Sequence, residues 1–134
     1  MAPVAEISTS QRLLLVDDNA DALQAMAELL RMHGYDCALA GDGAQGLTAA
    51  KDHVPEIAII DVGLPGLDGF GLAAELRRLY GPRVTLIAMS GYSATDTQLR
   101  AEQAGFDNFL VKPIDMPVLL QLLQRLPEAP RPSP

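Results

Sequence analysis

Five short runs of apolar residues recur along the chain, and a segment with helical periodicity follows each of them. The runs are LLLV from Leu13, YDCALA from Tyr35, IAII from Ile57, VTLIAM from Val84 and FLV from Phe109. Most of these runs are continuous rather than alternating, which is typical of strands that are buried on both faces of a parallel sheet. The sequence therefore predicts an α/β fold built around such a sheet.

The segments between the runs carry apolar residues at the spacing of one helix face. Two of them follow the pattern i, i+3, i+4, i+7, at Leu23, Met26, Ala27 and Leu30 and at Leu119, Leu122, Leu123 and Leu126. Three glycines stand where helices are expected to end, at Gly34, Gly81 and Gly105. A strand–helix unit repeated five times implies right-handed crossovers and helices on both faces of the sheet.

The two ends of the chain differ in composition from its body. Residues 1–10 are mixed and unpatterned, and residues 127–134 read PEAPRPSP. We expect an N-terminal extension over residues 1–10, one folded domain over residues 11–126 and a Pro-rich tail or linker over residues 127–134. A chain of 134 residues is long enough to bury a core in a single domain without disulfides.

The charge and the cysteine content exclude several classes of protein. The 10 Lys and Arg residues and 17 Asp and Glu residues give a net charge of −7, which argues against nucleic acid as the main partner. Cys37 is the single cysteine, so no internal disulfide or zinc-ligand spacing is present, and we expect it in the core. No export signal or membrane-inserting segment is recognisable, and a cytoplasmic location is expected.

Polar and ionisable residues end four of the apolar runs. Asp17 and Asp18 follow the first run, Asp61 the third, Ser90 the fourth and Lys112 the fifth. Ligands of doubly wound sheets bind beyond the carboxyl ends of the strands, near the point where the strand order reverses. If the strand order is 2-1-3-4-5, the three carboxylates meet at that point, with the hydroxyl and the ammonium beside them.

Three carboxylates packed together repel one another unless they take up protons or bind a cation. All of the candidate ligands are oxygen atoms, which suits Mg²⁺. One carboxylate more than the metal needs is then free to react. Asp61 can attack phosphorus and form an acyl phosphate, while Mg²⁺, Lys112 and Ser90 offset the charge of the transferring group.

Each of these residues also has a common structural role. Asp17 and Asp18 can cap the helix that follows them, and Asp61 can cap the helix after GLPG. Ser90 can serve in a turn, and Lys112 can be a surface charge. Chance rarely brings four strand ends with complementary groups to one edge, which favours the functional interpretation.

The set Asp17–Asp18, Asp61, Ser90 and Lys112, with the segments DVGLPGLDG and GFDNFLVKP, resembles the receiver domain of two-component response regulators. The resemblance covers about residues 12–126. It fits either a free-standing receiver or a receiver of a hybrid histidine kinase, and the segments MSGY and GFDNFLVKPID look more like the latter. It implies a flavodoxin-like (βα)₅ doubly wound fold and a role in phosphorelay signal transduction. Asp61 would accept a phosphoryl group from a histidine of a partner kinase or phosphotransfer protein.

The resemblance also implies how the site residues divide their work. Mg²⁺ would be held by Asp18, Asp61 and the main-chain carbonyl of Gly63, with Asp17 acting largely through a metal-bound water. Ser90 and Lys112 would contact the aspartyl phosphate. The Lys112–Pro113 bond would be cis, which X–Pro bonds tolerate.

Three positions bear on how the phosphorylated state is read and how long it lasts. Phe109 stands where the family often has tyrosine, so a switch there depends on packing alone, and an ordinary core phenylalanine is the competing interpretation. Gly63 and Tyr92 flank the path of the water that hydrolyses the acyl phosphate in this family. Neither residue is expected to orient that water, so we expect a long-lived phosphoryl state. The competing interpretation is that Gly63 meets the requirement of a turn and that Tyr92 is a solvated loop residue without influence.

The first predicted helix has apolar residues beyond its core face, at Ala22, Ala25, Leu29 and Met32. We expect this stripe to receive a helix of the phosphodonor, although extra core packing explains it equally well. The chain has no Gly-rich loop or kinase histidine motif, so the donor is expected to be another protein. We expect a monomeric phosphoacceptor that assists its own phosphorylation and dephosphorylation, rather than an enzyme.

Two other classes of protein share this switch-point geometry. A flavodoxin-like cofactor binder needs small hydroxylated residues to wrap a phosphate, whereas the loop here is DDNAD and the chain has no Trp. A phosphohydrolase with an Asp nucleophile would want an acid two residues after Asp61, where Gly63 stands.

Overall fold

The computed structural model describes residues 11–63, 68–91 and 95–126. Its five strands are β1 (Arg12–Val16), β2 (Asp36–Ala40), β3 (Ile57–Asp61), β4 (Thr85–Ser90) and β5 (Asn108–Val111). They form one parallel sheet in the order β2-β1-β3-β4-β5. The predicted strands, their parallel pairing and the flavodoxin-like strand order are confirmed.

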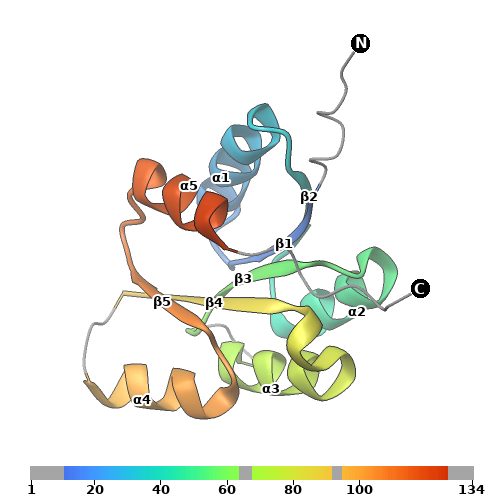
Figure 1. Ribbon diagram of the computed structural model, residues 1–134, viewed down its shortest axis with the longest axis vertical. Helices are drawn as coiled ribbons and strands as arrows, with labels where there is room; N and C mark the ends of the chain where they lie inside the picture. The colour runs from blue at the N-terminus through green and yellow to red at the C-terminus, as the bar shows by residue number, and fades with distance from the viewer. Residues whose placement is uncertain (1–10, 64–67, 92–94, 127–134) are drawn as a thin grey trace.

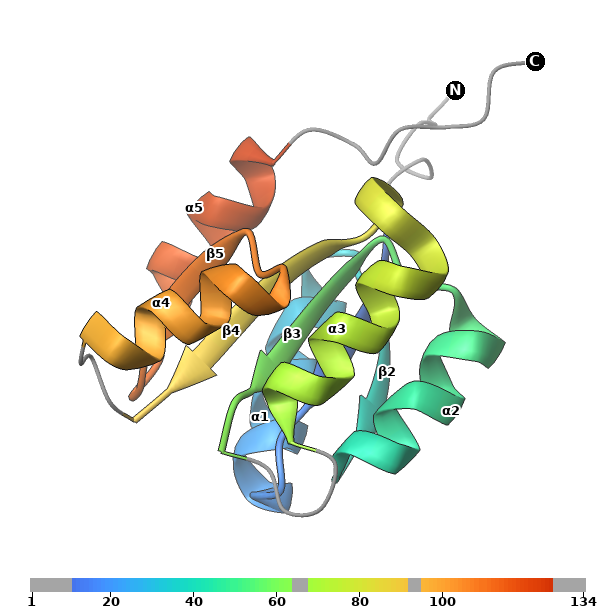
Figure 2. The same ribbon diagram turned by 90° about the horizontal axis from the view of Figure 1, so that it is seen from below.

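Helices cover both faces of the sheet (Figures 1 and 2). They are α1 (Ala20–Met32), α2 (Gly43–His53), α3 (Gly69–Tyr80), α4 (Thr95–Ala104) and α5 (Met116–Arg125), with a short 3₁₀ turn η2 (Gly81–Arg83) after α3. Helices α1 and α5 lie on one face, and α2, α3 and α4 lie on the other. Each of the five helices follows a strand along the chain. These helices therefore begin near the edge of the sheet where the strands end, which we call the carboxyl edge. They end near the opposite edge, which we call the amino edge.

The central strands explain the continuous apolar runs of the sequence. Leu13 and Ile59 pack with α1 and α5, while Leu14 and Ile60 pack with the helices of the other face. All four of these side chains are 0 % exposed. Successive residues of a strand point to opposite faces, so a strand covered on both faces needs apolar residues at every position.

Three glycines end helices with a left-handed backbone, as the sequence predicts. Gly34, Gly81 and Gly105 follow α1, α3 and α4, with φ values of 93°, 59° and 106°. Residues with a Cβ rarely adopt this conformation, and glycine adopts it readily. The glycines therefore help to set where these three helices stop.

Cys37 is 7 % exposed and belongs to the core beside α1 and α5. Burial raises the pKa of its thiol, as expected for a core cysteine rather than a reactive one. In the part of the chain that the structure describes, no helix has the length and apolar character needed to cross a bilayer. The expected N-terminal extension and Pro-rich tail lie outside the described residues.

Candidate functional site

The carboxyl ends of β1 and β3 bring three aspartates together. Val16 pairs with Ile60 in the sheet, so Asp17 and Asp61 follow neighbouring positions of two adjacent strands. Each of Asp17, Asp18 and Asp61 offers a carboxylate oxygen, and these oxygens lie within 4.8 Å of one another. We call these three residues the acidic cluster. Asp17 and Asp61 are only 4 % and 8 % exposed, whereas Asp18 is exposed.

Lys112 bridges two members of the acidic cluster. Its Nζ donates hydrogen bonds to Asp17 Oδ2 and to Asp61 Oδ2, both at 3.0 Å. Burial lowers the pKa of Lys112, but its hydrogen bonds and charge interactions with Asp61 and Asp17 outweigh burial and raise that pKa above its ordinary value. The ammonium is therefore held in its charged form between the two buried carboxylates.

The main chain positions both Lys112 and the aspartates. The Lys112 N–H donates to the carbonyl of Ser90 at 2.7 Å, and the predicted cis Lys112–Pro113 bond is confirmed. The Gly63 N–H donates to Asp61 Oδ1 at 2.9 Å. The Asn19 N–H donates to Asp17 Oδ1 at 3.0 Å. Each buried carboxylate thus has one oxygen on a main-chain N–H and the other on Lys112.

The structure rules out the ordinary capping roles considered for the aspartates. The side chain that caps α1 is Asn19, which accepts from the Ala22 N–H at 3.1 Å. The side chain that caps α3 is Asp68, which accepts from the Gly71 N–H at 2.7 Å. Helix capping therefore does not explain why Asp17 and Asp61 stand at the carboxyl edge.

Ser90, Phe109 and Gly63 are the remaining predicted site residues that the structure describes. Ser90 is 3 % exposed and ends β4, one position beyond Met89, which pairs with Asp61. Phe109 is half-buried in β5 and packs against the core beneath α2, α3 and α4. Tyr92 lies outside the described residues. At Gly63 an added Cβ would lie 3.5 Å from Asp61 Oδ1, which is an ordinary contact distance.

The apolar stripe of α1 forms one wall of a groove beside the acidic cluster. Ala22 and Ala25 are exposed, and Met32 is 80 % exposed, so these residues are not part of the core. The groove has a volume of about 650 Å³, and both walls are largely apolar. Its lining comprises Asp17, Asn19, Ala22, Ala25, Met26, Leu29, Met89, Lys112, Pro113, Ile114 and Met116.

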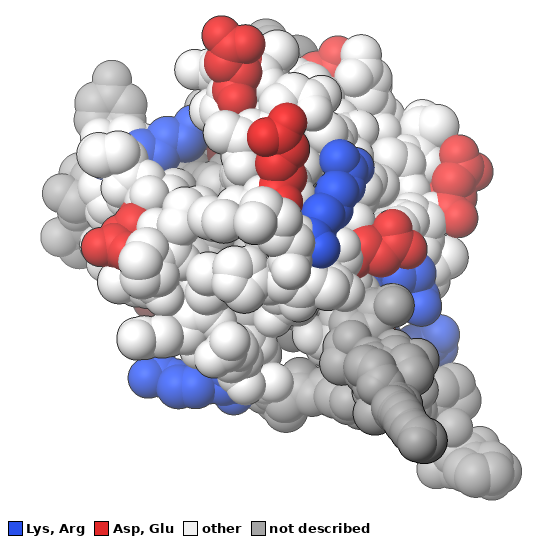
Figure 3. Space-filling model, turned by 90° about the horizontal axis from the view of Figure 1, so that it is seen from above, with Lys and Arg blue, Asp and Glu red and all other residues white. Residues whose placement is uncertain are grey.

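The sequence did not reveal the second wall of this groove, which Pro113, Ile114 and Met116 supply. It also placed Met32 in the stripe, although Met32 does not line the groove. Seen from the side of α1 and α5, much of the surface is made of uncharged residues, and acidic and basic side chains lie next to one another on part of it (Figure 3). Because Asp17 and Lys112 also line the groove, its apolar surface leads directly to the cluster.

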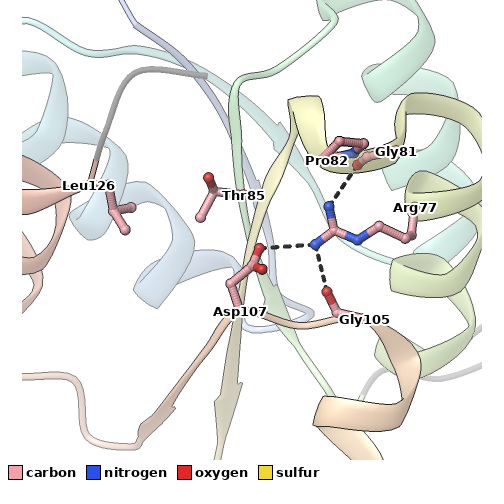
Figure 4. Close-up of a pocket in the computed structure, with 7 residues that line it drawn as sticks. All are labelled: Arg77, Gly81, Pro82, Thr85, Gly105, Asp107 and Leu126. Atoms are coloured by element: carbon pink, nitrogen blue, oxygen red, sulfur yellow. Dashed lines mark hydrogen bonds and ion pairs between the residues drawn. The ribbon is translucent and has the colours of Figure 1, made fainter. Parts of the chain in front are cut away.

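A second cluster of charged residues, which sequence reasoning missed, lies at the amino edge (Figure 4). The Arg77 guanidinium donates to the carbonyl oxygens of Gly81, Val84 and Gly105 and to Asp107 Oδ2, at 2.6 to 2.9 Å. Asp107 Oδ2 also accepts from the Leu86 N–H at 2.8 Å. All four terminal N–H groups of Arg77 are thus engaged, which makes the neighbouring cavity of about 480 Å³ a poor anion site.

A comparison with protein families and a comparison with curated proteins indicate the same family. A family model described as the response regulator receiver domain matches residues 13–124. The transcriptional regulatory protein PrrA of Mycobacterium tuberculosis is 36% identical over 118 residues, which cover 88% of this chain and 49% of PrrA. The DNA-binding response regulator MtrA of the same organism is 33% identical over 103 residues, which cover 77% of this chain and 44% of MtrA. The chain thus spans about half the length of the curated relatives it matches.

Solved structures show the same fold. The chemotaxis response regulator CheY4 of Vibrio cholerae superposes with a TM-score of 0.81 at 26% identity, covering 87% of this chain and 98% of CheY4. A response regulator protein from Burkholderia pseudomallei superposes with a TM-score of 0.78 at 29% identity, covering 86% of this chain and 67% of that one. The structure of the Burkholderia protein contains a phosphorylated aspartic acid, a calcium ion and citrate.

Proposed function

The chain belongs to the response regulator receiver domain family, and on that premise we propose that Asp61 is its phosphoacceptor. Receiver domains of two-component systems are phosphoacceptor signalling domains, and this chain is one of them. The observation that carries the assignment to Asp61 is its placement. It is a nearly buried carboxylate at the end of the central strand β3, held by Lys112 and by the Gly63 N–H inside the acidic cluster.

The charge of the acidic cluster supports a divalent cation as its partner. Three carboxylates and one ammonium leave a charge of −3 + 1 = −2, which one Mg²⁺ would neutralise. Oxygen ligands alone suit this hard ion, and the residues present fit it. Asp18, Asp61 and the main-chain carbonyl of Gly63 would hold the ion, with Asp17 acting through a water. The bound ion would supply positive charge beside the incoming phosphoryl oxygens.

The geometry around Asp61 supports in-line transfer of a phosphoryl group from a histidine. A carboxylate oxygen of Asp61 attacks phosphorus, the new O–P bond forms as the P–N bond breaks, and the electron pair of the broken bond stays on the imidazole nitrogen. Lys112 Nζ is already 3.0 Å from Asp61 Oδ2, so a small movement brings the ammonium to a phosphoryl oxygen. The Ser90 hydroxyl would donate a hydrogen bond to the same phosphoryl group. These residues let the domain assist a reaction whose phosphoryl group comes from a kinase or phosphotransfer protein.

The simplest test compares two Asp→Asn substitutions at the same edge of the sheet. Asp61→Asn keeps the size of the side chain but removes the nucleophile, so it should fold and fail to label with acetyl phosphate and Mg²⁺. Asp42→Asn is the matched control, because Asp42 caps α2 and asparagine caps a helix equally well. Labelling of Asp61→Asn at the wild-type level would refute the assignment, and loss of labelling in Asp42→Asn would show a general charge effect.

We also propose that the groove between α1 and the β5–α5 segment receives the apolar face of a phosphodonor helix. Ala25 lines the groove and is exposed, so Ala25→Glu places a charge in it without disturbing the core. This substitution should slow transfer from a phosphorylated partner protein and leave labelling by acetyl phosphate unchanged. Equal loss in both assays would contradict the docking proposal, because a small donor does not need the groove.

The expectation that nucleic acid is no partner is not supported for a whole protein that contains this domain. MtrA is named a DNA-binding response regulator, and the matched part is 44% of its length. PrrA is likewise named a transcriptional regulatory protein. We therefore propose that, where this receiver is joined to a DNA-binding part, phosphorylation of Asp61 regulates that part.

A further inference from the structure

Gly69 is the first residue of α3, and it packs directly against the main chain of the proposed phosphoacceptor. A Cβ added to Gly69 would overlap the carbonyl oxygen of Asp61 and would lie 2.6 Å from the Cα of Val62. Both contacts are to main-chain atoms, which cannot turn aside as the end of a flexible side chain can. The space at the end of β3 therefore admits only glycine unless the strand or the helix moves.

The backbone conformation of Gly69 does not explain why a glycine stands there. Among the described residues, the glycines with positive φ are Gly34, Gly81 and Gly105, and Gly69 is not one of them. Gly69 is also not the residue that caps α3, because the side chain of Asp68 has that role. The close approach to Asp61 is the feature of this position that requires glycine.

Neither side of this contact is free to yield. On the strand side, the Val62 N–H donates to the carbonyl of Met89 in β4 at 2.9 Å, and Val62 is 8 % exposed. On the helix side, α3 is anchored by side chains that are 0 % exposed, at Leu72, Ala73 and Leu76. A methyl group at position 69 must therefore displace the main chain of residues 61 and 62, or force an anchored helix outward.

Either movement reaches the groups that hold the Asp61 carboxylate. Asp61 Oδ1 is 2.9 Å from the Gly63 nitrogen, and Asp61 Oδ2 is 3.0 Å from Lys112 Nζ. We propose that Gly69 is a positioning residue, whose missing side chain lets the start of α3 support the Asp61 main chain and so aim its carboxylate at the cation and the phosphorus. This inference rests on the proposed function of Asp61.

The test compares Gly69→Ala with Gly46→Ala. Gly46 is a buried glycine of α2, and a Cβ there would meet Leu72 Cδ2 at 2.9 Å and Val16 Cγ2 at 3.3 Å, which are side-chain ends rather than main chain. Both substitutions should lower stability. In folded protein well below its unfolding temperature, Gly69→Ala should lose about tenfold in its rate of labelling by acetyl phosphate, because small misplacements of reacting groups slow reactions strongly.

Binding of Mg²⁺ gives a second measurement that a purely structural role would not change. Gly69→Ala should bind the ion more weakly, whereas Gly46→Ala should keep the wild-type affinity. A folded Gly69→Ala protein with wild-type labelling rate and Mg²⁺ affinity would overturn the inference. Such a result would leave the proposed function standing, provided that Asp61→Asn still fails to label.

A second pair of variants keeps the inference testable if Gly69→Ala does not fold. Asp68→Ala removes the cap of α3 and loosens its first turn, while Asp68→Asn keeps the cap. Labelling should be slower in Asp68→Ala and should return towards the wild-type rate in Asp68→Asn. Equal rates in these two variants would overturn the inference, because the start of α3 would then have no influence on Asp61.

Discussion

The two edges of the sheet use similar charged groups in opposite ways. At the carboxyl edge, three carboxylates share the ammonium of Lys112. At the amino edge, the guanidinium of Arg77 pairs with one carboxylate, Asp107, and with three main-chain carbonyls. The first arrangement leaves an excess of negative charge, whereas the second engages every terminal N–H of the guanidinium. The charge left at the carboxyl edge suits the cation binding and phosphoryl transfer that we propose there, whereas the charged groups at the amino edge offset one another.

The topology itself contributes to this separation. Helices of a parallel α/β fold begin at the carboxyl edge, where Asp42, Asp68 and Asp115 cap three of them. The same helices end at the amino edge, where Arg31, Lys51, Arg77, Arg78 and Arg125 lie in last turns. Both placements suit the helix dipole. The acidic cluster therefore lies at an edge that is already rich in carboxylates.

The largest expected effect is on stability at the amino edge. Arg77→Met keeps much of the aliphatic stem but leaves three carbonyls and Asp107 without their partner. Since the Arg77 side chain is 26 % exposed, water will replace part of what is lost. We expect the free energy of unfolding in urea to fall by about 2 to 3 kcal/mol, with labelling of the folded protein unchanged.

Arg78→Met is the control for that substitution. The Arg78 side chain is 66 % exposed and pairs only with Glu75 on the same helix, and such surface pairs contribute little. If Arg77→Met were as stable as Arg78→Met, the amino edge would not have the stabilising role assigned to it. If folded Arg77→Met failed to label, the two edges would not be separable in function.

The next effect is kinetic and belongs to the carboxyl edge. Gly63 has no side chain with which to orient water, and a Cβ added at this position would lie at an ordinary contact distance from Asp61 Oδ1. Gly63→Asn should speed loss of the phosphoryl group by about tenfold, which corresponds to about 1.4 kcal/mol of barrier. Tyr92→Ala should also speed it, if Tyr92 lies across the path of the water. Decay of labelled protein measures both rates, and rates equal to the wild type would show that the water approaches elsewhere.

The smallest expected effect is a gain in stability at the carboxyl edge, whereas Arg77→Met at the amino edge should cause a loss. Asp18→Ala removes one of three mutually repelling carboxylates, so the metal-free protein should become more stable, by less than about 1 kcal/mol because Asp18 is exposed. The same variant should lose the stabilisation that added Mg²⁺ gives to the wild type. Thermal unfolding with and without Mg²⁺ measures both changes.

Asp21→Ala is the control for Asp18→Ala. Asp21 is exposed and lies in the first turn of α1, where a negative charge favours the helix, and it is not part of the acidic cluster. This variant should not gain stability and should keep the response to Mg²⁺. A less stable metal-free Asp18→Ala protein would contradict the account of a crowded acidic cluster.

The sequence was sufficient for the parts of the molecule that depend on local pattern. The run IAII predicted a strand covered on both faces, and the polar residues after the runs predicted which groups meet at the carboxyl edge. Which residue caps a helix depends on a shift of one or two positions, so the sequence could not choose Asn19 over Asp17 or Asp18.

Contacts across long separations could not be predicted in this way. Arg77 reaches Gly105 and Asp107, which are 28 and 30 residues further along the chain, and nothing in the pattern of α3 marks it. The close approach of Gly69 to Asp61 likewise depends on how α3 settles on β3. Only the assembled fold shows these contacts.

Chemical trapping of the acyl phosphate tests the central claim most directly. Protein labelled with acetyl phosphate and Mg²⁺ is treated with borohydride, which reduces an aspartyl phosphate to homoserine, and the changed residue is located by peptide mass spectrometry. The account predicts conversion of Asp61 to homoserine only when both donor and Mg²⁺ are present. Conversion of Asp17 or Asp18 instead, or phosphate on any other residue while Asp61 stays intact, would contradict it.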